Sequence, residues 1–172
     1  MDQVGLKFYY DFRDGPGGGK TIAVNIAVGK SESRQDFITS KELREKLAAK
    51  GFKAGESFGG FFFVLREPEK RLDVYSHVPI QLEGAGLAGL KEFRGMGLGT
   101  EIEKIVYQRV RKECGQIGKV RFYQITKPML NRLVHLGHSK QAVEEGLTFA
   151  AFEGSIRKKR LQHLQKYRRK IK

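Results

Sequence analysis

The sequence predicts a single mixed α/β domain with a twisted, mostly antiparallel sheet flanked by helices. Three observations support this fold class. The chain has 172 residues, about the size of one compact domain. Its hydrophobic fraction of 40%, with 12 Phe, is typical of a chain that buries a core. Alternating apolar segments are interspersed with segments whose apolar residues recur at helical spacing. We assign residues 1–155 to this domain and residues 156–172 to a basic C-terminal tail or helix.

The N-terminal segment predicts a β-hairpin. Leu6–Phe12 and Thr21–Val28 form its strands, and the glycine-rich loop at 14–20 supplies the turn. Part of this loop, Gly15–Thr21, resembles a nucleotide-binding P-loop, but Asp14 stands in place of the required first glycine. The residues that follow are typical of a strand rather than a helix, so we favour the hairpin.

The next elements are a helix and two strands. A capping box at Thr39–Glu42 predicts a helix from about Ser40 to Lys50. Phe61–Leu65 and Leu72–Ile80 are expected to be adjacent antiparallel strands. Gln81–Leu90 is a further candidate strand, although its small residues weaken that prediction.

The C-terminal half alternates between helices and strands. A second capping box at Thr100–Glu103 predicts a helix that ends near Glu113. A strand at Lys119–Thr126, a short helix at Pro128–Leu136 and a last strand at Leu147–Glu153 complete the predicted order.

A glycine-rich loop leads directly into the helix near residue 100. Consecutive backbone N–H groups at a helix N-terminus bind anions, and glycine removes side chains that would keep a pyrophosphate away. Because the loop follows several β segments, past the middle of the chain, it does not fit the Rossmann pattern, in which the loop follows the first strand. A tight strand-to-helix turn without a ligand is the alternative interpretation.

The segment from Leu87 to Gly99 resembles the coenzyme-A signature of the GNAT superfamily of acyl-CoA-dependent N-acyltransferases. Arg94, Gly97 and Gly99 occupy its defining positions, and the resemblance extends from about Leu72 to His138. It implies a GNAT-like sheet splayed at the strand before the loop, with acetyl-CoA or a related acyl-CoA as co-substrate. The residues it implies for acyl-CoA binding are Leu87, Ala88, Gly89, Arg94, Gly95, Met96, Gly97, Leu98, Gly99 and Thr100.

The resemblance also suggests catalytic residues. An acceptor amine must be neutral to attack the thioester, and the family's basic glutamate falls at or near Glu83, which is equally consistent with a solvent-facing strand carboxylate. Glu92 is a weaker candidate. Many members protonate the leaving thiolate with a tyrosine, but Leu133 stands at that position. Tyr123, His135 or water remain as donors, and we take Tyr123 as the candidate although packing is the commoner role of a strand tyrosine.

The positive charge is concentrated at the C-terminus. Of a net charge of +14, residues 156–172 contribute nine Lys and Arg and no acid. This favours contact with a phosphate backbone over a solvated tail. An acyl acceptor on a nucleic acid or a nucleic-acid-associated partner is therefore favoured over a free basic peptide, and a non-catalytic nucleic-acid-binding protein is the alternative. The tail residues expected to contact phosphates include Arg157, Lys158, Lys159, Arg160, Arg168 and Arg169.

Several classes of protein are not expected. Cys114 is the only cysteine, which excludes an intramolecular disulfide and a cysteine-based metal site. His135 and His138 form a His-x-x-His pair without an acidic or cysteine partner at metal spacing, so we expect no metal. The sequence contains neither an apolar run long enough to span a membrane nor the pattern of a signal peptide. We therefore expect no membrane association and a cytoplasmic protein.

Overall fold

The structure, a computed structural model, describes residues 3–31, 35–76, 93, 96–123, 125 and 127–171. Over these residues a seven-stranded sheet has the order β3-β1-β2-β4-β5-β6-β7 and is antiparallel except for the pair β5 and β6. The mixed α/β class is confirmed. The strands are β1 (Gln3–Asp14), β2 (Lys20–Ser31), β3 (Phe37–Ile38), β4 (Ser57–Arg66), β5 (Arg71–Ser76), β6 (Lys119–Phe122) and β7 (Leu147–Thr148). The helices are α1 (Lys41–Ala49), α3 (Leu98–Cys114), α4 (Lys127–His135), α5 (Lys140–Glu145) and α6 (Phe149–Ile171), with a short 3-10 helix at Pro16–Gly18.

The predicted N-terminal hairpin is confirmed and is longer than expected. β1 and β2 pair without interruption from Gln3 with Ser31 to Asp14 with Lys20. Gly17 takes a left-handed φ of 66° in the turn, which favours glycine there. Because strand β2 begins at Lys20, no helix follows the loop that resembles a P-loop, and the hairpin interpretation holds.

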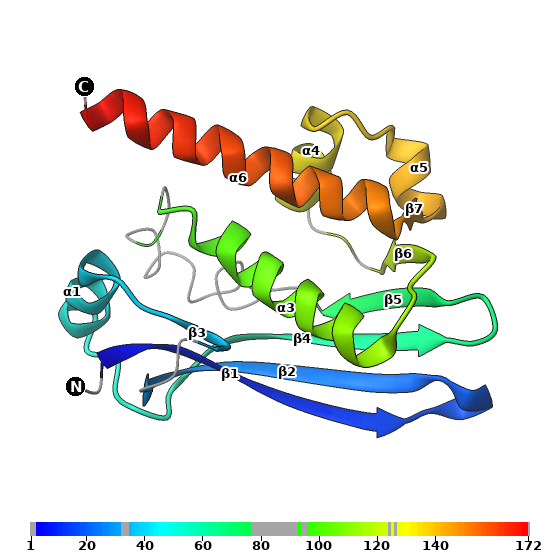
Figure 1. Cartoon of the computed structure of the whole chain (residues 1–172), viewed down its shortest axis with the longest axis horizontal. Helices are drawn as coiled ribbons and strands as arrows, with labels where there is room; N and C mark the ends of the chain where they lie inside the picture. Colours follow the sequence, from blue (N-terminus) through cyan, green and yellow to red (C-terminus); the bar gives the residue numbers. More distant parts are fainter. Residues whose placement is uncertain are drawn as a thin grey trace.

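One face of the sheet carries the core, and we call it the inner face. Apolar residues at alternate positions of the strands pack there against α1, α3 and α6. Tyr107 of α3 is fully buried at its centre, with ring contacts to Phe61 and Phe63 of β4 and to Phe152 of α6. Figure 1 shows α3 lying over the sheet and α6 running along α3. Helix α3 therefore connects two parallel neighbours, β5 and β6, across the core.

Helix α6 joins the basic C-terminal segment to the core without a break. Ile156 is buried in the core, and Arg160 pairs with Glu101 of α3 through Nε and Oε1 at 2.7 Å. Glu153 pairs with Arg111 of α3 at 2.9 Å. The boundary proposed between residues 155 and 156 thus lies inside a continuous helix (Figure 1).

Two capping boxes predicted from the sequence are wrong by one or more residues. Helix α1 has Ser40 as its N-cap, whose hydroxyl accepts from the N–H of Leu43 at 3.1 Å, while Thr39 donates to the carbonyl of Val4. Helix α3 begins at Leu98, so Thr100 lies inside its first turn and is buried. In both segments a glutamate follows the threonine by three residues, as in a capping box, but the threonine is not the N-cap residue.

The predicted last strand is also wrong. Leu147–Thr148 is a two-residue strand, and helix α6 begins at Phe149. Phe149, Phe152 and Ile156 recur at helical spacing and are all buried, so helical packing of this segment prevails over extension. Strand β6 ends at Phe122, four residues before the predicted end. The candidate strand Gln81–Leu90 lies outside the described residues.

The opposite, outer face of the sheet carries a different set of side chains. Arg66 of β4, three residues of β5, Arg121 of β6 and Tyr123 just after β6 point to this side, because the residues that alternate with them belong to the core. These outer-face residues are Arg66, Arg71, Asp73, Tyr75, Arg121 and Tyr123. In the part of the chain that the structure describes, no helix is long and apolar enough to cross a membrane.

Candidate functional site

The N-terminus of α3 has the geometry of an anion site. Gly97 is the N-cap residue, and its left-handed conformation, with φ of 70° and ψ of 14°, turns the chain into the helix. No side chain caps this terminus, and the first intrahelical bond runs from the N–H of Glu101 to the carbonyl of Gly97 at 3.1 Å. The N–H groups of Leu98, Gly99 and Thr100 precede that bond, so none of them has an intrahelical acceptor. These N–H groups point out of the helix at its N-terminus, which is the positive end of the helix dipole.

The space beside this terminus is open at Gly99. A Cβ atom added to Gly99 would meet no heavy atom within 4 Å, and its φ is not in the left-handed region. Gly97 is thus required by the backbone conformation, whereas Gly99 leaves room next to the N–H groups. A phosphate group needs both features, because it must approach the backbone closely.

Buried residues lie on either side of the α3 terminus. Phe93 is buried and makes edge-to-face contacts with Phe52 and Phe58 at 6.2 and 5.4 Å. Met96 packs against the core, and Leu98 and Thr100 are buried. Of the predicted binding and catalytic residues, those outside the described part of the chain are Glu83, Leu87, Ala88, Gly89, Arg94 and Gly95, together with the weaker candidate Glu92.

Helix α6 places a cation next to this terminus. Glu101 lies in the first turn of α3, where its carboxylate would oppose a bound anion, but Arg160 of α6 pairs with it at 2.7 Å. Arg160 was predicted to contact nucleic acid as part of the basic C-terminal tail or helix. Its position beside α3 neutralises Glu101 and keeps the first turn compatible with a phosphate.

A second ionic group lies deeper between the helices. Glu103 of α3 is buried and accepts hydrogen bonds from both terminal nitrogens of Arg132 of α4. Lys159 of α6 is half-buried nearby, and its burial, together with the charge of Arg132, lowers its pKa to about 8 against the opposing effect of Glu103. Lys159 is therefore not a freely solvated phosphate ligand, unlike the exposed Arg157 and Lys158.

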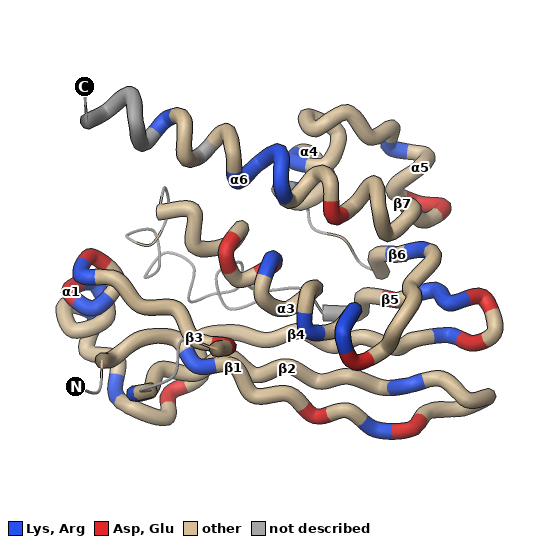
Figure 2. Tube along the Cα trace, in the orientation of Figure 1, with Lys and Arg blue, Asp and Glu red and all other residues tan. Residues whose placement is uncertain are grey.

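The remaining predicted tail residues continue along α6. Figure 2 shows Lys and Arg recurring along this helix toward the C-terminus. Arg168 and Arg169 lie within the helix, although their side chains are outside the described set.

The structure places Tyr123 immediately after β6, on the outer face. Its N–H donates to the carbonyl of Val74 at 2.9 Å, which extends the parallel pairing of β5 and β6 by one bond. Its ring stacks on Tyr75 with centroids 4.7 Å apart, and the guanidinium of Arg121 lies 5.0 Å from its centroid. Tyr123 thus lies at the carboxyl ends of the two parallel strands.

His135, the other side chain considered as proton donor, and Leu133, at the position of the family's tyrosine, both lie in α4. Leu133 is fully buried in the core, so the residue at the family's tyrosine position is a packing residue here. His135 is exposed at the end of α4. His138 is paired with Ser155 of α6, and burial followed by the charge of Lys158 lowers its pKa.

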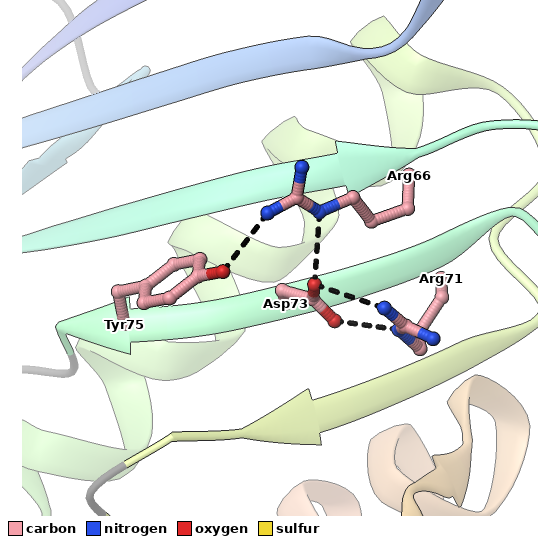
Figure 3. Close-up of polar contacts among 4 residues, drawn as sticks. All are labelled: Arg66, Arg71, Asp73 and Tyr75. Carbon is pink, nitrogen blue, oxygen red and sulfur yellow. Dashed lines mark hydrogen bonds and ion pairs between the residues drawn. The ribbon is translucent and has the colours of Figure 1, made fainter. Parts of the chain in front are cut away.

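An ionic cluster on the outer face was not predicted from the sequence. Asp73 is 0% exposed, and its carboxylate accepts from Arg66 Nε at 3.1 Å and from Arg71 Nε at 2.7 Å. Arg66 Nη2 also donates to the hydroxyl of Tyr75 at 3.0 Å. Figure 3 shows the four side chains together on one side of β4 and β5. The alternating Arg71-Leu72-Asp73-Val74-Tyr75 pattern signals a two-faced strand, but the pairing with Arg66 depends on the β4–β5 register.

The comparisons with known proteins identify no relative. Neither a family model, nor a curated protein, nor a solved structure matches this chain.

Proposed function

We propose that this chain is an acyl-CoA-dependent N-acyltransferase that binds the pyrophosphate of acetyl-CoA, or of a related acyl-CoA, at the N-terminus of α3. The observation that carries the proposal is the uncapped first turn of α3, with Gly97 in the left-handed conformation and open space at Gly99. Together with the resemblance of residues 87–99 to the coenzyme-A signature, this turn favours a bound pyrophosphate over a simple strand-to-helix turn.

The order of elements supports the same proposal. The parallel strands β5 and β6 are connected across the core through α3, and α3 begins at the end of the sheet toward which β5 runs (Figure 1). In sheets of this kind ligands bind outside the carboxyl ends of parallel strands. A thioester extending from the α3 terminus on the inner face, and around these ends to the outer face, would approach Tyr123.

The proposed reaction is direct transfer of the acyl group to an amine. The amine nitrogen attacks the thioester carbonyl, the carbon–sulfur bond breaks, and the amine loses a proton while the thiolate gains one. Glu83 is proposed as the base and Tyr123 as the acid. Glu83→Gln and Tyr123→Phe should each lower turnover while leaving acetyl-CoA affinity unchanged. A loss of affinity with unchanged turnover would contradict these roles.

The first experiment is a thermal-shift titration with acetyl-CoA. Ligand at 100 times its Kd stabilises a protein by about 2.7 kcal/mol, which corresponds to about 5–11 °C for a domain of this size. Gly99→Glu places a carboxylate in the open space at the N–H groups and should abolish the shift. Polyphosphate serves as the charge control and should not reproduce it.

Gly154→Glu is the matched control. Gly154 lies in α6, and a Cβ there also meets open space, so the same substitution is tested on a helix away from the proposed site. It should retain the full acetyl-CoA shift. If wild type shows no specific shift, or if both variants lose it equally, the acyl-CoA site is contradicted.

Non-catalytic nucleic-acid binding through α6 is the second candidate function. The observation that favours it is the continuous α6 helix, on which Arg157, Lys158 and Lys166 are exposed. This function predicts salt-sensitive binding that Gly99→Glu leaves intact and that Arg157→Gln with Lys158→Gln weakens. Acetyl-CoA binding that Gly99→Glu abolishes, and that Arg157→Gln with Lys158→Gln leaves intact, would favour the enzyme.

A further inference from the structure

A row of aromatic side chains crosses the outer face of three adjacent strands. Phe62 of β4 lies 6.2 Å from Tyr75 of β5, and Tyr75 stacks on Tyr123 beside β6 at 4.7 Å, all between ring centroids. The guanidinium of Arg121 continues the row over the ring of Tyr123. We call Phe62, Tyr75 and Tyr123 the aromatic row.

The exposure of this row is not explained by the core. The buried rings of Phe61, Phe63 and Tyr107 pack on the inner face, whereas Phe62 is 39% and Tyr75 38% exposed. Exposed apolar rings gathered on one surface commonly mark a binding site. Binding to the aromatic row also costs little side-chain entropy, because Tyr and Phe have only two side-chain torsions to order.

Arginines flank the row and are held in place by a buried acid. The carboxylate of Asp73 binds Arg66 and Arg71, and Arg66 also bonds to the Tyr75 hydroxyl (Figure 3). Each guanidinium has five N–H donors, so these bonds leave further donors on both side chains. Arg121 adds a third guanidinium group to this surface. The one carboxylate among the outer-face residues, that of Asp73, has no contact with solvent. The outer face of β4, β5 and β6 therefore carries net positive charge beside planar rings.

This combination favours one class of occupant. Rings stack on nucleic-acid bases, and guanidinium groups pair with phosphates through parallel hydrogen bonds. In a duplex the bases already stack on one another, so rings on a flat sheet face suit a single strand, whose bases are available for stacking. A second copy of this chain is disfavoured, because each copy carries a net charge of +14.

We propose that the outer face of β4, β5 and β6 binds single-stranded nucleic acid, with a base stacked on the ring of Phe62 and phosphates paired with Arg66, Arg71 and Arg121. This site is separate from the basic residues of α6, since α6 packs on the core side of the sheet. It does not depend on acyl-CoA binding, so either proposal can fail without the other.

The test is fluorescence anisotropy of the full chain with labelled ten-nucleotide oligo(U) and oligo(dT), which separate RNA from DNA as the preferred strand. Phe62→Leu keeps an apolar strand residue but removes the ring, and we expect about 5- to 150-fold weaker binding to the preferred strand, the range for losing one stacked base. Arg121→Gln should reduce the slope of log affinity against log salt by about 0.7, the value for one phosphate contact in a single strand.

Tyr9→Leu is the matched control, because Tyr9 is 49% exposed but lies on β1, separated from β4 by β2. It should bind as wild type does. The loss caused by Phe62→Leu should persist in the Arg157→Gln, Lys158→Gln background, which weakens any binding by α6. Circular dichroism and melting temperature verify that each variant is folded.

Three results would overturn the proposal. These are absence of oligonucleotide binding by wild type, equal affinities of folded Phe62→Leu and wild type, and a dimer in sedimentation that Phe62→Leu dissociates. The last result would assign the outer face to contact between copies of this chain.

Discussion

Asp73 holds two arginines in place while its own carboxylate has no contact with solvent. A buried carboxylate is tolerated because several donors surround it, and here Arg66 and Arg71 supply three hydrogen bonds. The same bonds fix the positions of both guanidinium groups on the outer face. At the scale of the single residue, one acid thus provides both local stability and the geometry of a positively charged surface.

Replacing Asp73 should destabilise the fold. Asp73→Ala leaves two guanidinium groups without their acceptor, and hydrogen bonds to charged groups contribute about 1.5–3 kcal/mol each. Because both arginines are partly exposed and can be rehydrated, we expect a total loss of about 2–3 kcal/mol in urea denaturation. Asp11→Ala is the control, since its pair with Arg13 is exposed, and it should cost less than about 1 kcal/mol. Equal losses in the two variants would contradict this account.

Lys159 should make stability depend on pH. Its folded pKa of about 8 lies below its usual value of 10.5, so between these values the unfolded chain binds more protons than the folded one. The free energy of unfolding contributed by Lys159 therefore rises as pH increases through this window. Lys159→Met removes the charge, and we expect it to be more stable than wild type at pH 7.5, with the difference shrinking by pH 9.5.

Urea denaturation of both proteins across that range measures this difference. Comparison with the variant is needed because burial raises the pKa of the Cys114 thiol, which opposes the effect by lowering stability at high pH. A difference between the two proteins that stays constant with pH would show that Lys159 does not titrate in this window.

At the scale of the element, the two glycines at the start of α3 have different physical roles. Gly97 adopts a left-handed conformation, which costs other residues about 1–2 kcal/mol. Gly99 has an ordinary helical position with open space around it, where alanine is favoured over glycine by about 1 kcal/mol. We expect Gly97→Ala to lower and Gly99→Ala to raise the free energy of unfolding, as measured in urea. Changes of the same sign would contradict the assigned N-cap.

Local patterns in the sequence predicted most elements but not their ends. The hairpin, α1, β4, β5, α3 and α4 follow from period and turn residues, because those signals are local. The start of α6 was predicted as a strand because Leu147 and Phe149 alternate as in a strand, although Phe149 and Phe152 are three residues apart, as on one face of a helix. Packing on Tyr107 and Phe122 selects the helix. Nothing within residues 147–153 alone carries that information.

The candidate sites differ in how far the sequence predicts them. The anion site at α3 was predictable because it depends on consecutive residues, with glycines just before a helix. The pairing of Arg66 with Asp73 was not, because it depends on the register of the β4–β5 ladder, in which Arg66 pairs with Arg71 and Val64 with Asp73. The pairing of Arg160 with Glu101 likewise depends on the packing of α6 against α3, 59 residues apart in sequence.

At the scale of the whole molecule, net charge and stability should be separable. Among the residues of α6 whose burial the structure describes, Ile156 is the last in the core, and Leu161 and Leu164 beyond it are 60% and 42% exposed. Residues 166–172 contain five Lys and Arg and no acid, so their deletion lowers the net charge from +14 to +9. We expect this deletion to leave the melting temperature nearly unchanged, because five of the seven residues that it removes are Lys or Arg, which are seldom buried.

The same deletion should change nucleic-acid binding in a way that distinguishes the two surfaces. If α6 contacts phosphates, the slope of log affinity against log salt should fall by up to about 3.5, because each contact to a single strand contributes about 0.7. The stacking contribution of Phe62 should remain, so Phe62→Leu should weaken oligo(U) or oligo(dT) binding by the same factor in the deleted and the full-length chain. Anisotropy titrations at four salt concentrations measure both quantities. A Phe62 effect that disappears with the deletion would mean that the strand binds only when α6 holds it, and the sheet face would then not be an independent site.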